Sequence, residues 1–271
     1  MRILFFGDIV GRPAREALVK ILPELKKEFK PDLVLANGEN IGHGQGISEN
    51  SIKEVVDGGI DFLTTGDHAF VLPSSDILFE NKQWPILRPL NWSGQAPGRG
   101  YEILNVGARR VLLVNLIGRV FMRHDFDDPF AKIQELLDDY SLKGAEQGSE
   151  NMDAIIVDLH AEATSEKEAL SWFLDGKVSA VLGTHTHVPT ADERVLPHGT
   201  AAISDVGMVG ATDSVLGADK NIVIKRFLTQ RLFKMEVAKG PVEINAVILE
   251  IDDRTGKAKS IERIRRIIAL D

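Results

Sequence analysis

Short apolar runs alternate with helical patterns along this chain, and this alternation is the feature that most restricts its fold. The apolar runs are residues 2–6, 33–36, 62–65, 154–159, 180–182 and 201–204. Their length and their lack of helical period favour buried β-strands. Strands that alternate with helices are typical of layered α/β proteins. The sequence therefore predicts α/β layers.

Helical patterns fill several of the intervals between these runs. One spans residues 13–29, with Pro13 in its first turn, and Pro23 is expected to kink or break it. A second spans residues 48–57 and should end at Gly58 and Gly59, and a third spans residues 129–142. Ser165 and Glu168 have the spacing of a capping box that would open a further helix ending near Leu174.

Two β-hairpins are expected as well. Residues 101–106 and 110–116 flank Gly107-Ala108, and residues 243–251 and 260–268 flank the polar stretch 252–257. Hairpins add antiparallel strands, so the sheets should be mixed. The polar stretch 143–152 reads as a surface loop. No repeat or linker divides the chain, and a single domain over residues 1–271 is expected.

Composition excludes several classes of protein. The 271 residues contain 44% hydrophobic and 27% charged residues, which is ordinary globular usage. The absence of cysteine excludes disulfides and thiolate chemistry. A net charge of −8 argues against an extended nucleic-acid partner. The apolar run at residues 3–6 is too short for a signal peptide, and no run is long enough to span a membrane, so a cytoplasmic protein is expected.

The residues that follow the predicted strands share a few side-chain types, namely carboxylate, amide and imidazole. They are Asp8, Glu39, Asn40, Asp67, His160, His185 and His187. Ligands of open α/β sheets collect outside the carboxyl ends of the strands, so these loops should converge. A mixed nitrogen and oxygen set suits first-row ions such as manganese, iron or zinc.

Seven ligands are more than one ion usually takes, and they suit two ions with a bridging carboxylate. Two metals about 3.5–4 Å apart clamp the oxygens of a phosphoryl displacement and acidify a bridging water. Phosphate ester hydrolysis is the natural chemistry of such a pair. Taken singly, Gly7-Asp8 is common turn chemistry, and a lone histidine after a strand is usually structural. The hypothesis depends on their joint occurrence at successive strand ends.

The order of these motifs resembles that of the calcineurin-like metallophosphoesterases. The closer resemblance is to the bacterial YmdB-like phosphodiesterase family, and it rests on motifs spread from residue 7 to residue 208. These are residues 7–11, 37–40, Arg88-Pro89 with Asn91, 183–188, 190–193 and 205–208. The resemblance implies a sandwich of two mixed β-sheets flanked by helices.

The resemblance also implies a role for each residue. Asp8, Asn40 and His187 would bind a first metal, Asp67, His160 and His185 a second, and Glu39 would bridge them. His68 would donate a proton to the leaving oxygen. The family hydrolyses phosphodiesters, including 2′,3′-cyclic AMP, with iron or manganese, so a small phosphodiester substrate is expected.

One motif departs from the family pattern. The family has Gly-Asn-His where this chain has Gly66-Asp67-His68. Asparagine is a neutral ligand, whereas an ionised Asp67 adds a negative charge. We expect tighter metal retention but a less acidic metal-bound water.

Several alternatives stay open at this point. The same core also hydrolyses phosphomonoesters, and the chain could instead be a weakly active, metal-bound regulatory module or a mononuclear scaffold. Arg12 is either a phosphate contact or an exposed ion-pair partner, and His43 either contacts substrate or lies on the surface. Residues 206–217 are expected as a rim near the metals, with Asp205 or Asp213 orienting a ligand histidine. A homo-oligomer is possible, because hairpins leave strand edges to be covered.

Overall fold

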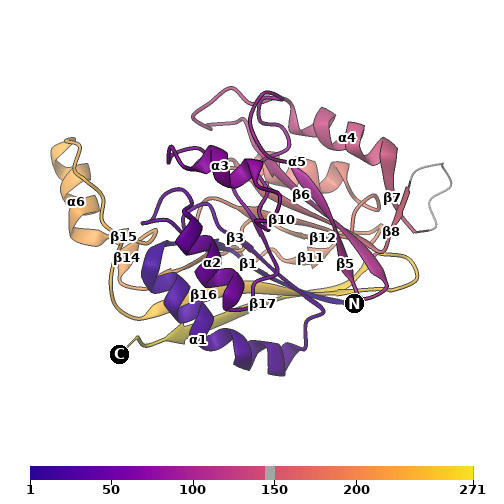
Figure 1. The fold of residues 1–271 in the computed structure, drawn as a ribbon, viewed down its shortest axis with the longest axis horizontal. Coiled ribbons are helices and arrows are strands. Elements are labelled where there is room, and N and C mark those ends of the chain that lie inside the picture. Colours follow the sequence, from indigo (N-terminus) through magenta and orange to yellow (C-terminus); the bar gives the residue numbers. More distant parts are fainter. Residues whose placement is uncertain (144–149, 271) are drawn as a thin grey trace.

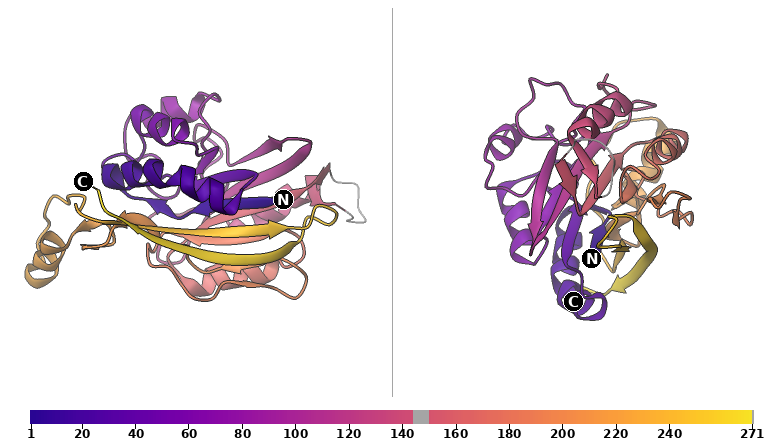
Figure 2. Two further views of the ribbon diagram at one scale, coloured as in Figure 1. Left: turned by 90° about the horizontal axis from the view of Figure 1, so that it is seen from below. Right: turned by 90° about the vertical axis from the view of Figure 1, so that its right-hand side faces the viewer.

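The fold is a four-layer sandwich in which two β-sheets lie face to face and helices cover both outer faces (Figures 1 and 2). The computed structural model describes residues 1–143 and 150–270. Both sheets combine parallel and antiparallel neighbours, as expected from the hairpins. The predicted sandwich of two mixed sheets flanked by helices is therefore confirmed.

The first sheet is built around β1 (Arg2–Phe6), which pairs parallel with β3 (Leu33–Asn37) and antiparallel with β16 (Val242–Ile251). Its other strands are β4 (Phe62–Thr64) beside β3, the short β2 (Asp8–Ile9) and β13 (Met208–Ala211), and β17 (Ala258–Ile268), which forms the predicted hairpin with β16.

The second sheet has β9 (Ala154–His160) in its interior, parallel to β6 (Arg109–Ile117) on one side and to β10 (Ala180–Thr184) on the other. The remaining strands are β5 (Tyr101–Val106), which forms the other predicted hairpin with β6, and β12 (Ala201–Ile203) and β11 (Arg194–Val195) beyond β10.

The apolar strands are buried on both faces, which explains their continuous hydrophobic runs. Along β1, Leu4 and Phe6 contact the helices, while Ile3 and Phe5 contact the core between the sheets. The first sheet is covered by α1 (Gly11–Phe29), α2 (Glu49–Asp57) and α3 (Ser75–Glu80), and the second by α4 (Pro129–Asp139) and α5 (Thr164–Phe173).

Local structure differs from the expectations at three places. Pro23 was expected to kink or break α1, and the helix is not broken, because the Pro23 ring lies on the exposed side while Leu18, Leu22 and Leu25 hold the buried side. The helix α5 begins at Thr164, its N-cap Ala163 makes no side-chain cap, and Glu168 instead contacts Arg194 at 2.6 Å, so no capping box forms.

The helix expected over residues 129–142 ends at Asp139. The chain continues as the strand β7 (Tyr140–Leu142), which pairs with β8 (Glu150–Met152). The loop expected over residues 143–152 therefore ends in a strand, and its residues 144–149 lie outside the described part of the chain. Within the described residues, no helix has the length and apolar character needed to cross a membrane.

One segment projects from the sandwich. We call residues 212–241, which connect β13 to β16, the arm. It contains β14 (Ser214–Val215), β15 (Ala218–Asp219) and α6 (Lys220–Thr229), and α6 points away from both sheets in Figures 1 and 2. The two ends of the arm are joined by a hydrogen bond from the Thr212 nitrogen to the Pro241 oxygen, at 2.9 Å.

Candidate metal centre

The fold brings every predicted site residue to one end of the sandwich. Each follows or ends a core strand: Asp8 after β1, Glu39 and Asn40 after β3, Asp67 and His68 after β4, His160 at the end of β9, and His185 and His187 after β10. These strands come from both sheets, so the site lies between the two sheet edges and not on one sheet.

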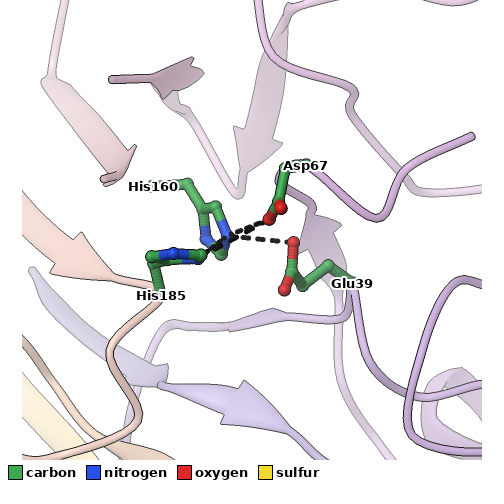
Figure 3. A group of neighbouring side chains, drawn as sticks. All are labelled: Glu39, Asp67, His160 and His185. Atoms are coloured by element: carbon green, nitrogen blue, oxygen red, sulfur yellow. Dashed lines mark hydrogen bonds and ion pairs between the residues drawn. The ribbon is translucent and has the colours of Figure 1, made fainter. Parts of the chain in front are cut away.

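Two groups of these side chains lie close enough to hold a cation. Within each group, the ligand atoms lie within 4.8 Å of one another. The first group is Glu39, Asp67, His160 and His185 (Figure 3), and the second is Asp8, Glu39 and His187. Because Glu39 belongs to both groups, it has the position that a bridging carboxylate requires.

His160 is completely buried, and its two nitrogens have different partners. Thr184 Oγ1 donates to Asp158 at 2.8 Å, so it can accept from His160 Nδ1 at 2.9 Å. The other nitrogen, Nε2, lies 2.9 Å from Glu39 Oε2 and 3.3 Å from Asp67 Oδ1. Burial alone would lower the pKa of His160, but Glu39 and Asp67 outweigh it and raise the pKa well above its ordinary value.

His185 faces this group with its Nδ1 atom. The other ring nitrogen, Nε2, lies 3.1 Å from Glu162 Oε2. A carboxylate can only accept, so Nε2 carries the hydrogen. Its Nδ1 therefore presents a lone pair to His160 Nε2 at 3.0 Å. Burial, followed by the charge of His160, lowers the pKa of His185 to about 4. The proton on His160 Nε2 is thus surrounded by three acceptors, which belong to Glu39, Asp67 and His185. A cation at this position would interact favourably with all three.

His187 is oriented in the same way in the second group. Its Nδ1 lies 3.0 Å from the Leu216 carbonyl oxygen, which can only accept. Its Nε2 is left as an acceptor, 3.2 Å from Asn40 Nδ2 and 3.8 Å from Asp8 Oδ1. Ligand histidines usually donate their second nitrogen to a protein acceptor in this manner.

Asp8 gives an independent sign that a cation fits. Its Oδ2 accepts from the backbone nitrogen of His185 at 3.1 Å, whereas its Oδ1 is buried without a hydrogen-bond partner among the described residues. Burial raises the pKa of Asp8 to about 7, against the opposing charges of His187 and His160. An orphaned carboxylate oxygen in a buried site is costly unless a cation or proton compensates it.

Gly66 keeps the first group accessible. A Cβ atom at this position would lie 2.1 Å from His160 Cδ2 and 2.3 Å from Glu39 Oε2. Any side chain here would therefore fill the space on which the ligand atoms converge. The donor set, the orphaned oxygen and this glycine all fit a bound metal.

The carboxylates of the first group are held ionised without a metal. Burial acts to raise the pKa of Glu39, but His160 and His68 lower it well below its ordinary value. Burial likewise acts to raise the pKa of Asp67, and the hydrogen bond with His160 more than reverses this, so the pKa is lowered. Both groups are therefore available as anionic ligands at neutral pH.

His68 lies beside the metal groups and faces a cavity. Its Nδ1 donates to Asn40 Oδ1 at 2.8 Å and lies 3.1 Å from Glu39 Oε1. Burial acts to lower its pKa, but the hydrogen bond and charge of Glu39 raise it. Asn40 turns its amide nitrogen toward Glu39 and His187, so in this arrangement its oxygen is engaged by His68. Coordination of a metal through that oxygen would require the amide to turn over.

A strained loop carries His185 and His187, whose φ angles are 99° and 64°. Asp205 Oδ2 accepts from Thr186 at both its nitrogen (3.1 Å) and its Oγ1 (2.8 Å), and it pairs with Lys167 Nζ at 2.8 Å. The Lys167–Asp205 pair is buried. Since such backbone conformations persist only when the surroundings enforce them, this pair has a positioning role.

The expectation that Asp205 or Asp213 orients a ligand histidine is therefore wrong in its detail. Asp205 acts on the backbone and hydroxyl of Thr186, and Asp213 pairs with Lys220. Sequence reasoning missed the groups that do contact the histidines, namely Thr184, Glu162 and the Leu216 carbonyl. One signal was available for the underlying network, because Asp158 interrupts an otherwise apolar buried strand two residues before His160.

The open side of the centre is a cavity of about 350 Å³. Asn40, His68 and His187 line it, and so does His43, which therefore lies on the cavity side. Residues 215–217 also line it, so part of the predicted rim 206–217 borders the site. Arg12 does not take part, because it is exposed and pairs with Glu16 at 2.6 Å.

This sandwich of two mixed sheets is the fold of the calcineurin-like phosphoesterases. A calcineurin-like phosphoesterase from Bacillus subtilis superposes with a TM-score of 0.57 over 99% of this chain and 90% of its own, at 14% identity. At that identity the likeness shows the fold. Proteins of this class are metal-dependent, and the clustered ligands of this chain agree with that.

Within that class, the chain belongs to the YmdB-like protein family, whose pattern it matches over residues 4–264. It is 42% identical over 265 residues, 97% of this chain and 96% of the relative, to a 2′,3′-cyclic-nucleotide 2′-phosphodiesterase from Bacillus subtilis. A hypothetical protein from Thermus thermophilus has a TM-score of 0.89 at 38% identity, covering 98% and 99% of the two chains. The family predicted from the motifs is confirmed, and with it an enzyme of the phosphodiesterase class.

Proposed function

We propose that this chain hydrolyses small phosphodiesters, 2′,3′-cyclic nucleotides such as 2′,3′-cyclic AMP in particular, at a centre of two metal ions. Asp8, Asn40 and His187 would hold one ion, Asp67, His160 and His185 the other, and Glu39 would bridge them. The observation that carries the proposal is the convergence of the inner nitrogens of three histidines with three carboxylates next to His68, which lines the cavity together with His187. The similarity to the Bacillus subtilis phosphodiesterase supports the substrate class.

The residues present suit iron or manganese, because the set mixes imidazole with carboxylate and lacks thiolate. When bound, such ions supply positive charge to the phosphoryl oxygens and acidify a water. The chain's own contribution is to hold the ligand atoms in place. The Thr184 hydroxyl, the Glu162 carboxylate and the Leu216 carbonyl each contact the outer nitrogen of one of the three histidines. These partners fix which nitrogen of each ring faces the site.

His68 would act as the proton donor to the departing alkoxide, which is a poor leaving group. Asn40 and Glu39 hold its Nδ1, and its ring borders the cavity. Imidazole titrates near neutrality, so it can supply a proton in one step and recover it in the next. A general acid of this kind contributes about 10²–10⁴-fold to the rate.

The test combines metal quantification on protein purified without chelators with hydrolysis of 2′,3′-cyclic AMP. We expect two metals per chain, and about 100-fold or greater loss of kcat in His68→Ala with metal content retained. Full activity in His68→Ala would remove the proton-donor role. One metal per chain without hydrolysis would instead support a mononuclear scaffold.

The phosphomonoesterase alternative is separated by a matched pair of substrates. We expect hydrolysis of bis-p-nitrophenyl phosphate to exceed that of p-nitrophenyl phosphate, and the reverse order would favour a phosphomonoesterase. The overall charge of −8 supports a small substrate over an extended nucleic acid.

A further inference from the structure

The cavity beside His68 has two chemically different walls. One wall carries the polar side chains Asn40, His68 and His187 of the metal centre. A second set of lining residues, which we call the apolar wall, comes from the arm and consists of Val215, Leu216, Val223, Phe227, Met235 and Val237. The arm is tied to the centre itself, because the Leu216 carbonyl accepts from His187 Nδ1 at 3.0 Å. A molecule in this cavity would contact both walls at once.

Three of the side chains that form this wall are unusually accessible for large apolar groups, although Val223 is buried. Phe227 is 79% exposed, Leu216 49% and Met235 37%. They line a cavity of about 350 Å³, near the lower end of the volume range of small-molecule sites. A phosphate alone would occupy the polar side and leave this wall in contact with water. The wall is useful to a substrate only if a flat, largely apolar group extends from the phosphate.

We propose that the apolar wall of the arm is the subsite for the nucleobase of the substrate, with Phe227 and Met235 as its specificity-determining residues. This inference rests on the proposed function, and it adds that the nucleoside is recognised and not only the cyclic diester. Aromatic and thioether side chains suit the face of a base. Gln45 and Glu236 also line the cavity and offer polar atoms to the edge of the base.

The chain offers a matched control on the same helix. Leu228 is adjacent to Phe227 and as exposed, at 81%, but it does not line the cavity. Replacing either residue by alanine removes a large exposed apolar side chain from α6. Only Phe227→Ala should alter the recognition of a base, so an effect shared by both variants would reflect the helix and not the subsite.

The experiment compares kcat/KM for 2′,3′-cyclic AMP with that for ethylene phosphate, which has the same five-membered cyclic diester without a nucleoside. We expect the ratio of the two values to fall about tenfold in Phe227→Ala and in Met235→Ala, mainly through the KM of the nucleotide. The ratio should stay at the wild-type value in Leu228→Ala. A ratio that is unchanged in Phe227→Ala and Met235→Ala would overturn the subsite.

Failure of the proposed function has a different signature. If the metal-loaded wild type hydrolyses neither diester, the function fails, and calorimetric binding of 3′-AMP then decides the subsite. Binding that weakens in Phe227→Ala but not in Leu228→Ala would still support a base subsite. Equal binding of 3′-AMP by the wild type, Phe227→Ala and Leu228→Ala would rule out the base subsite. If the wild type turns over both diesters equally well, the phosphodiesterase stands and the base subsite falls.

Discussion

The metal centre and the arm are neighbours, joined by the hydrogen bond between His187 and Leu216, but they are ordered by different forces. At the centre, His160 and Glu39 are buried and nearly every polar atom has a partner within the chain. On α6 of the arm, all of which the structure describes, Val223 is the only buried residue, and large apolar side chains face solvent. Hydrogen bonds and ion pairs therefore hold the side chains of the centre in place, whereas few packing contacts hold α6 of the arm.

The difference has a physical reason. Metal ligands must lie in one geometry before the metal arrives, and neighbouring carboxylates and imidazoles reach that geometry only if a second layer of hydrogen bonds fixes them. A wall that receives a nucleobase needs accessible apolar surface, which cannot be buried in the core as well. The arm can adjust to its ligand because few contacts hold it.

The largest expected effect comes from breaking the support beneath the strained His185–His187 loop. Lys167→Met would leave the carboxylate of Asp205 buried without its ion-pair partner, and losing one partner of a buried pair costs about 3 kcal/mol or more of unfolding free energy. Stability to chemical denaturation and metal content should both decrease. Lys53→Met, which removes an exposed pair with Asp57, is the control and should change little. Normal stability and metal content in Lys167→Met would show that the loop is held in another way.

The second prediction concerns the arm. The backbone amides of α6 should exchange with deuterium at least about 100-fold faster than those of β9, because the helix buries so little apolar surface. Hydrogen exchange followed by mass spectrometry measures this, and addition of 3′-AMP should slow exchange in the arm more than in β9. Equal protection of α6 and β9 in the free protein would contradict the contrast between the two regions.

These two regions also differ in how far the sequence predicts them. The clustering of the candidate ligands was predictable because each residue ends or follows an apolar strand, and strand ends converge in α/β folds. The core strands were predictable from their continuous apolar runs, and the hairpins from the turn residues between paired runs. Residues 215–217 of the arm were part of the predicted rim, but Phe227 and Met235 were not predictable, because only the tertiary path of residues 212–241 brings them to the cavity that His68 lines.

The errors have physical causes as well. Pro23 is tolerated in α1 because packing on the opposite side offsets the lost hydrogen bond. The strand β7 forms through pairing with β8, which lies further along the chain, and local pattern cannot show that pairing. Glu168 has capping-box spacing, but Arg194 and Ser204 compete for its carboxylate in the folded state. In each case, contacts with residues distant in the sequence determine the local structure.

A third prediction concerns Asp67, where the family motif has asparagine. Asp67→Asn removes a negative charge 3.3 Å from His160 Nε2, and the centre should then hold its metal less tightly while the metal becomes more electrophilic. We expect kcat to rise several-fold and metal retention during dialysis to fall by about tenfold. Steady-state kinetics with parallel elemental analysis checks both. Unchanged kcat and unchanged metal content would show that the extra charge has no consequence.

The smallest expected effect lies far from both regions, in the turn of the β16–β17 hairpin. Asp252 accepts from the Arg254 nitrogen at 2.9 Å and the Thr255 nitrogen at 3.1 Å, and it pairs with Lys259. The Arg254 hydrogen bond is the first cause that lowers the pKa of Asp252 to about 2, from an ordinary value of 3.8.

Because the folded pKa is the lower one, the ionised carboxylate stabilises the fold above about pH 4, and this contribution is lost as the pH falls toward about 2. Asp252→Asn keeps an acceptor for the turn but removes the charge. Its stability deficit relative to wild type should therefore be constant above about pH 4 and shrink below it, as measured by denaturant unfolding at each pH. A deficit that grows on acidification would contradict this assignment. Asp8, whose pKa is raised to about 7 by burial, behaves in the opposite sense, because burial disfavours its charged form.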